Sequence, residues 1–111
     1  MYHLLFHSKV EKQLSGIPRK NAKRLADKIR KLKENPRPEQ SIHLDIEMYR
    51  LRDGDYRVIY AVFDDDNVVY VGAIRQGNEK TYKDINRLLS RAINDLEERK
   101  LQFREDLDQG G

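Results

Sequence analysis

The sequence predicts an α+β protein with the element order β-α-α-β-β-β-α, built on a small, mainly antiparallel sheet with helices packed on one face. Three observations support this fold class. Apolar residues repeat at helical spacing in an early segment (residues 22–32) and again near the end (residues 85–96). Between them, short strand-like runs alternate with polar turns from residue 49 to residue 74. The chain therefore begins with a strand and two helices, continues as a meander, and ends in a helix.

The first half of the chain carries clear start and stop signals. Residues 2–7 suit a short strand, and Ser8 is a suitable N-cap with a glutamate three residues later, as in a capping box. Gly16 is expected to end this first helix. Pro18 fits the first turn of a second helix, because a missing N–H costs nothing there. Pro36 ends the second helix, since the residue before a proline is pushed out of the helical region.

The second half of the chain reads as a three-stranded antiparallel meander. Residues 49–52 alternate in polarity, and Asp53–Asp55 is a turn of the hairpin kind. Residues 56–63 are apolar on both faces apart from one arginine, which predicts a central strand. A polar turn at 64–67 and a third strand at 68–74 complete the meander. A final helix follows, and we expect its pattern to weaken after Leu96.

The face of the sheet that the helices leave open is expected to carry the polar strand residues. Arg50 and Arg52 share a face, because side chains alternate with a period of two. Arg57 interrupts an apolar strand, so its charge needs a partner or water. A structural ion pair with Asp53 or Asp55 is one interpretation of Arg57, and ligand binding is the other.

Composition limits the protein class. A chain of 111 residues fits one domain. It has no cysteine, which excludes disulfides and thiolate metal sites and favours a reducing cytoplasm. The apolar stretches are far shorter than a bilayer span, and the first residues lack the pattern of a signal peptide. We therefore expect a cytoplasmic protein without a membrane partner, metal or small-molecule cofactor.

Charge is unevenly distributed along the chain, although the formal net charge is only +3. Residues 19–34 contain eight Lys or Arg and two Asp or Glu, whereas residues 95–111 contain six acidic and three basic side chains. A basic run of this kind is either a solvated helix face or a binding surface for a polyanion or an acidic partner. Composition does not choose between these two interpretations.

The strand-turn-strand segment 49–60, with its three arginines and its Asp-Gly-Asp turn, is the most specific feature of the sequence. Together with Tyr82 and the order of the elements, it resembles the RelE/ParE superfamily of bacterial and archaeal toxins. The resemblance implies one toxin domain over residues 1–111, with a shared core of about residues 1–89. Residues 90–111 would then be a C-terminal helical extension with a disordered end. It also implies a type II toxin–antitoxin system and a cognate antitoxin protein as partner.

Two activities occur in that superfamily, and a third reading remains open. The favoured function is a ribosome-dependent mRNA endonuclease, an mRNA interferase that acts in the ribosomal A site and inhibits translation. The alternative is a ParE-like, non-enzymatic inhibitor of DNA gyrase. A catalytically inactive homologue that acts as an antitoxin-binding co-repressor is the third, with the basic helix over residues 19–33 as its docking surface.

The resemblance also implies site residues, matched by motif position. The catalytic set is Arg52, Arg57, Arg75 and Tyr82, and the RNA-binding set is Arg50, Arg52 and Lys80. Arginine holds phosphate oxygens through paired hydrogen bonds and stabilises developing phosphate charge, but it is a poor general base. Tyr82 would stack on a base or transfer a proton, although it also suits a core position at a helix start.

Two features qualify the nuclease reading. The three histidines, His3, His7 and His43, all lie outside the arginine-rich segment, so they are read as ordinary strand-end or surface residues. Many superfamily members carry a basic pair shortly before their tyrosine. Here Arg75 and Lys80 are the available substitutes, and neither has the usual spacing to Tyr82. Arg50 and Arg52 taken alone would suit an ordinary half-exposed strand.

Overall fold

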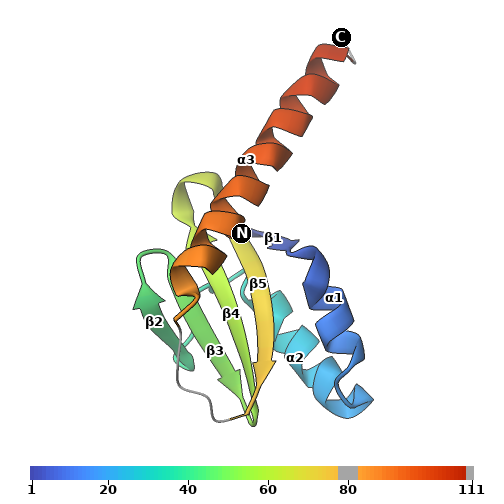
Figure 1. Ribbon diagram of the computed structural model, residues 1–111, viewed down its shortest axis with the longest axis vertical. Helices are drawn as coiled ribbons and strands as arrows, with labels where there is room; N and C mark the ends of the chain where they lie inside the picture. Colours follow the sequence, from blue (N-terminus) through green and yellow to red (C-terminus); the bar gives the residue numbers. More distant parts are fainter. Residues whose placement is uncertain (78–82, 110–111) are drawn as a thin grey trace.

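The computed structural model describes residues 1–77 and 83–109 of the chain, and it confirms the α+β fold class. The elements in order are β1 (His3–Phe6), α1 (Ser8–Ser15), α2 (Arg19–Lys31), β2 (Ser41–Asp45), β3 (Met48–Asp53), β4 (Tyr56–Phe63), a short 3₁₀ helix (Asp64–Asp66), β5 (Val68–Gln76) and α3 (Ile85–Gln109). The sheet is open, with the strand order β1-β5-β4-β3-β2 (Figure 1). Among the strands of the described residues, only the β1–β5 pair is parallel, so the sheet is mainly antiparallel as predicted.

The sheet has one more strand than the sequence predicted. The additional strand, β2, forms an antiparallel hairpin with β3, in which Ser41 lies opposite Leu51. Residues of β2 bury little surface, and Ile42 in its centre is 49% exposed. An edge strand of this kind is held by backbone pairing more than by packing, so its hydrophobic pattern is weak. That weak pattern is why the prediction placed no strand between the second helix and residue 49.

The first helix begins differently from the prediction, although its end is as expected. Ser8 is the first helical residue and His7 is the N-cap, with its ring Nδ1 accepting a hydrogen bond from the Lys9 N–H at 3.2 Å. The prediction of Ser8 as the cap was therefore wrong by one residue. The reason is that the His7 N–H binds the Val71 carbonyl, which keeps the chain extended through His7. Gly16 is the C-cap, as predicted.

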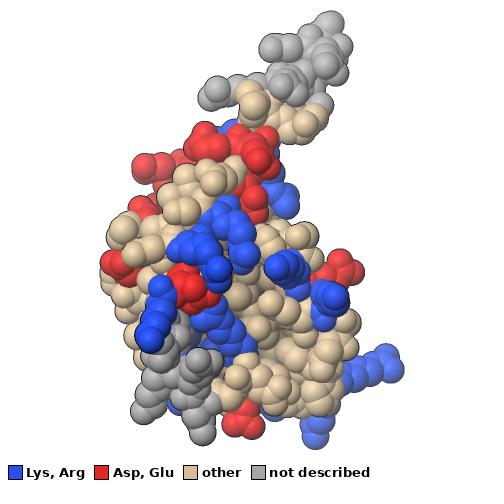
Figure 2. Space-filling model, in the orientation of Figure 1, with Lys and Arg blue, Asp and Glu red and all other residues tan. Residues whose placement is uncertain are grey.

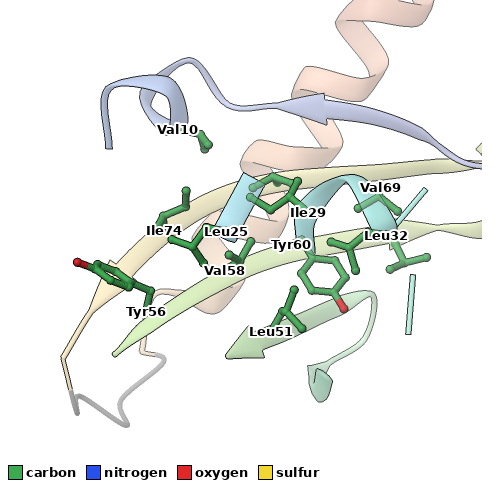
Figure 3. Packing of buried hydrophobic residues seen from close by; sticks show 12 residues of the cluster. Val10, Leu25, Ile29, Leu32, Leu51, Tyr56, Val58, Tyr60, Val69 and Ile74 are labelled. Carbon is green, nitrogen blue, oxygen red and sulfur yellow. The ribbon is translucent and has the colours of Figure 1, made fainter. Parts of the chain in front are cut away.

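One face of the sheet is covered by α1 and α2. Val10 of α1 and Leu25, Ile29 and Leu32 of the α2 segment pack against strand residues of this face (Figure 3). The strand residues in this core are Leu51, Tyr56, Val58, Tyr60, Val62, Val69, Val71 and Ile74. The apolar helical stripe recognised in the sequence is thus the stripe that faces the sheet, as amphipathic periodicity predicts.

The opposite face of the sheet carries α3, so the expectation that all helices pack on one face was wrong (Figure 1). The second core contains Leu88, Leu89, Ala92 and Leu96 of α3 with Met48, Ile59, Ala61, Val68, Tyr70 and Ala73 of the strands. The cause is visible in the sequence. Strands β4 and β5 are apolar on both faces, and a strand of that kind needs cover on both sides.

The helix α3 continues well past the sheet. It spans Ile85–Gln109, and its C-terminal part projects away from the other elements (Figure 1). Lys100 anchors the helix by an ion pair of 2.5 Å with Asp66. Leu101, directly after this anchor, is 56% exposed. The continuation of the helix past Leu96 was left open by the sequence. Within the described part of the chain, no helix is both long and apolar enough to span a membrane.

Candidate functional site: an arginine row on the α3 face

Three arginines from three adjacent strands stand side by side. Arg52 of β3 is the register partner of Arg57 in β4, and Arg57 is the register partner of Arg75 in β5. Directly opposed residues of neighbouring strands project from the same face, and neighbouring strands lie about 5 Å apart. We call Arg52, Arg57 and Arg75 the arginine row. The structure thus brings together three of the four residues predicted as catalytic.

A β-bulge places Arg75 in the arginine row. The register between β4 and β5 shifts after Ile59, which pairs with Ala73, whereas Tyr60 pairs with Val71. Gly72 is therefore the extra residue of β5, and its position in the middle of a strand is typical of a bulge. If β5 kept a strict alternation through Gly72, Arg75 would fall on the face covered by α1 and α2. The bulge turns it toward the face that carries α3.

The arginine row shares its face with α3. Arg57 lies on the same side of β4 as Ile59, which packs against α3. Arg50 lies opposite Ile59 and two residues before Arg52, so it belongs to this face as well. The exposure of the side chains is graded, since Arg57 is 4% exposed whereas Arg52 is exposed. Figure 2 shows this face, with Lys and Arg side chains gathered at its centre.

The residue directly before α3 brings a carboxylate to one end of the row. Asp84 forms an ion pair with Arg75 and a longer contact of 3.5 Å with Arg87. The hydrogen bond from Arg75 lowers the pKa of the Asp84 carboxyl below its usual value. Asp84 is therefore ionised at neutral pH. This ion pair connects the end of β5 to the start of α3.

Further basic residues of α3 border the row, and the sequence analysis missed them. Arg87 and Arg91 are four residues apart, so they lie on one side of the helix, and Lys83 precedes the helix at the same spacing. The Arg91 Nη2 donates a hydrogen bond of 3.3 Å to the carbonyl of Gly72, the bulge residue. The four-residue spacing is visible in the sequence and indicates a basic side of the helix. It could not be related to the arginines of the strands as long as α3 was expected on the other face of the sheet.

A buried carboxylate on the opposite face is one of the two partners that the sequence offered for Arg57. Asp53 was considered as a partner of Arg57, but it accepts hydrogen bonds from Arg24 at 2.8 Å and from Lys28 at 3.2 Å. Burial acts to raise the pKa of Asp53, and the two cationic donors of α2 outweigh it, so the pKa is lowered. Asp53 thus fixes α2 against β3. The charge of Arg57 is not neutralised by this carboxylate.

His43 and His7 both lie away from the arginine row. His43 lies opposite Tyr49 in the register of β2 and β3, and the centroids of the two rings are 4.9 Å apart. Tyr49 packs with the core of α1 and α2, which is the other face of the sheet. His7 caps α1. Across the described ranges 1–77 and 83–109, no three His, Cys, Asp or Glu side chains gather as a metal site would require.

Two of the predicted site residues lie outside the described residues. These are Tyr82, predicted as catalytic, and Lys80, predicted to bind RNA. The described chain resumes at Lys83, two residues before α3. The site that the structure defines therefore consists of Arg50 and the arginine row, with Asp84, Arg87 and Arg91 at its border.

This arrangement of a five-stranded open sheet with a cationic face agrees with the comparisons of sequence. Residues 4–81 match the family described as the ParE toxin of the type II toxin–antitoxin system parDE. A curated relative, RelE1 of Methanocaldococcus jannaschii, which is assigned as a toxin, is 32% identical over 87 residues, or 74% of this chain and 96% of the relative. The chain belongs to the RelE/ParE superfamily of toxins of type II toxin–antitoxin systems.

Solved structures of related toxins share the fold. The archaeal RelE–RelB complex from Pyrococcus horikoshii matches with a TM-score of 0.61 and 28% identity over 68% of this chain and 93% of that chain. The intact RelBE toxin–antitoxin complex of E. coli matches with a TM-score of 0.60 and 26% identity over 71% of this chain and 100% of that chain. Both likenesses confirm the superfamily that the segment 49–60 indicated.

Proposed function

We propose that this toxin is an mRNA interferase, a ribosome-dependent endoribonuclease that inhibits translation, and that the arginine row binds the RNA at the cleaved phosphate. The observation that carries the proposal is the register of Arg52, Arg57 and Arg75 across three adjacent strands. Three cations on one face form a strongly positive strip, and a polyanion is the ligand that fits it best.

The chemistry of RNA cleavage suits the graded exposure of the row. Cleavage needs stabilisation of the negative charge that builds on the phosphate, and a guanidinium that is shielded from water does this more effectively. Arg57 is 4% exposed and takes this role. Arg52 is exposed and binds the phosphate first, while Arg50 helps to hold the adjacent backbone. Arg75 completes the row in place of the basic pair of other family members.

The two site residues outside the described ranges keep their proposed roles. Tyr82 stacks on a base or transfers a proton, and Lys80 contacts the RNA backbone. The proposal for Tyr82 is supported by its place in the sequence, two residues before Asp84, which contacts the row. A tyrosine supplies both a stacking surface and a hydroxyl at one position.

RNA binding by the row is tested with a short single-stranded RNA and fluorescence anisotropy. Arg52→Ala should weaken binding and should lower the slope of log K against log salt by about 0.7, as expected for one phosphate contact to a single strand. Arg19→Ala is the matched control, because Arg19 is an exposed arginine of α2 on the other face of the sheet. An equal effect of the two substitutions would mean that the row has no special part in RNA binding.

The cellular activity is tested by inducing the toxin and following growth, translation and messages. The combination of Arg57→Ala and Tyr82→Phe should relieve toxicity if the row and Tyr82 carry the reaction. Because Arg57 is buried, Arg57→Met is a second variant that keeps the volume of the side chain while removing its charge. Undiminished toxicity of both Arg57 variants would exclude this site.

A ParE-like gyrase inhibitor is the second candidate function, and two observations favour it. The matching family is described by the ParE toxin, and the stretch between β5 and Tyr82 lacks the basic pair of many family members. Such a toxin traps the cleaved DNA complex of gyrase without chemistry of its own. DNA-damage signalling after induction, with translation continuing, would favour this function over RNA cleavage.

An antitoxin partner is proposed for either activity, since the related RelE proteins were solved as RelE–RelB complexes. The basic side of α2 is the proposed docking surface for acidic segments of that partner. Exposed cations there include Arg19, Lys20, Lys23, Arg30 and Lys31. If the protein is an inactive co-repressor, overexpression leaves growth unaffected while the antitoxin still binds.

A further inference from the structure

Asp84 occupies a distinctive place, between the end of β5 and the first turn of α3. It forms an ion pair with Arg75, nine positions earlier in the chain, and a longer contact with Arg87. We propose that Asp84 is a positioning residue that holds the Arg75 guanidinium in the arginine row, where Arg75 binds RNA phosphate. This inference rests on the proposed function of the row and adds the residue that preorganises one of its members.

The position of Arg75 explains why the row needs such a residue. Arg75 is the next-to-last residue of β5, and the two residues after it, Gln76 and Gly77, are exposed. Arg57 has a paired strand on both sides, since it lies between Arg52 and Arg75, whereas Arg75 is paired on one side only, because β1 pairs with Val68–Val71 of β5. A long arginine side chain at such a strand end loses much conformational freedom when it binds a ligand. A fixed carboxylate beside it removes part of that cost in advance.

The geometry identifies Arg75 as the main partner of Asp84. The two side chains are 27% and 26% exposed, so water screens the pair only partly. Arg87 is 78% exposed and reaches Asp84 at 3.5 Å, which is a weaker contact. The lowered pKa of Asp84 has the Arg75 hydrogen bond as its largest cause. Asp84 therefore acts chiefly on Arg75.

The same carboxylate leaves Arg75 able to bind a phosphate. The hydrogen bond to Asp84 involves the Nη2 end of the guanidinium, and a guanidinium has five N–H donors in a planar fork. One carboxylate engages one part of the fork, and the remaining donors can be directed at an oxyanion. Asp84 is thus suited to orient Arg75 rather than to replace the phosphate.

A double-mutant cycle with anisotropy of a fluorescent single-stranded RNA tests the proposal. Asp84→Ala should weaken RNA binding by about tenfold, as small misplacements of a binding group do. Removal of an acidic residue would by charge alone strengthen binding to RNA, so a weakening requires a positioning effect. In an Arg75→Ala background the same substitution should cause no further weakening, because Asp84 acts through Arg75. Asp27→Ala is the control, since Asp27 pairs with Arg30 on α2.

Two further measurements keep the test decisive. Thermal unfolding identifies a variant that has lost its fold, and Asp84→Asn, which keeps the shape of the side chain, then replaces Asp84→Ala in the cycle. The NMR signal of the Arg75 Nε–H should be sharp in the wild type and broadened or averaged in the Asp84 variant.

Unchanged or tighter RNA binding by a folded Asp84 variant overturns the proposal. A loss of RNA affinity that Asp84→Ala still causes in the Arg75→Ala background overturns it as well. If the wild type itself does not bind RNA, the proposed function fails, and the Arg75 signal alone decides the role of Asp84.

Discussion

Arg52 and Arg57 are direct cross-strand partners in the β3–β4 hairpin, and both belong to the face of the sheet that carries α3. Like charges directly opposite each other in an antiparallel pair destabilise the pair. Arg57 is 4% exposed in a strand that is otherwise apolar. The register thus places two like charges side by side, one of them shielded from water.

Relief of this repulsion should stabilise the protein while it impairs the site. We expect Arg52→Gln to raise the free energy of unfolding by about 0.5 kcal/mol, and Arg52→Glu to raise it further, because a glutamate opposite Arg57 forms an opposite-charge pair. Urea denaturation measures both, and RNA anisotropy measures the accompanying loss of binding. A folded state that loses stability with both substitutions would show that the Arg52–Arg57 contact is not repulsive.

Asp53 should stabilise the folded state and take no part in RNA binding. Its carboxylate accepts hydrogen bonds from Arg24 and Lys28, and the residue is 8% exposed. Asp53→Asn should lower the free energy of unfolding by about 1–3 kcal/mol, because it removes the charge that both cations of α2 require. Asp55→Asn, in the exposed turn next to it, is the matched control. Equal unfolding midpoints in urea for the two variants would contradict this assignment.

Stability should fall in acid, and Asp53 should be a principal cause. Burial favours a higher pKa for Asp53, but the hydrogen bonds from Arg24 and Lys28 prevail and hold it below the ordinary value of 3.8. A group whose pKa is lowered by folding stabilises the protein above its ordinary pKa. That contribution is lost as the pH falls through the lower pKa of the folded state. Asp64 and Asp84 have pKa values lowered in the same direction by Arg37 and Arg75.

Urea denaturation over a series of buffers from about pH 6 to about pH 3 measures this dependence. The free energy of unfolding should decrease most steeply at the acid end. The decrease should be shallower in Asp53→Asn, which has one fewer carboxyl to titrate. An identical pH dependence in the variant and the wild type would show that Asp53 does not contribute.

The packing of α3 on the second face can be tested by two leucines of the same helix. Leu96 is 6% exposed and packs against the strands, whereas Leu101 is 56% exposed. Leu96→Ala should lower the free energy of unfolding by about 2–4 kcal/mol, and Leu101→Ala should change it by less than about 0.5 kcal/mol. Both substitutions carry the same loss of helical side-chain bulk. Similar effects of the two would mean that α3 does not pack as the structure shows.

The elements of the sequence with strong periodicity were predicted well, and the reason is physical. The apolar stripe of α2 and the central strands β4 and β5 bury most of their apolar residues, so their pattern is unambiguous. Gly16 at the end of α1 acts through the local backbone, which the sequence specifies directly. Pro18, expected in the first turn of the second helix, is instead the N-cap of α2, one residue before the helix. The edge strand β2 buries little, and its pattern was therefore too weak to recognise.

The assembly of the site was harder to predict, because it depends on one residue that changes the register. A strict period of two from Tyr70 places Arg75 on the α1 and α2 face. The bulge at Gly72 moves it into the row with Arg57. A glycine inside a strand is a recognised signal of a bulge, but its effect on the later residues follows only from the pairing with β4. Asp84 and Arg87 joined the site only because α3 packs on this face.

The position of α3 illustrates the same limit. Its apolar stripe was recognised, yet the stripe alone does not say which face of the sheet it covers. The decisive information was the apolar character of both faces of β4 and β5, which requires cover on each side. That inference could have been drawn from the sequence.

The most direct test of the account is sequencing of RNA ends after induction of the toxin in growing cells. If the arginine row cleaves messenger RNA on the ribosome, translated messages should be cut within codons, and the cuts should disappear with Arg57→Met in toxin that is expressed and folded. Intact messages in cells whose growth has stopped would contradict this function. DNA-damage signalling with continued translation in the same cells would identify the protein as a gyrase inhibitor instead.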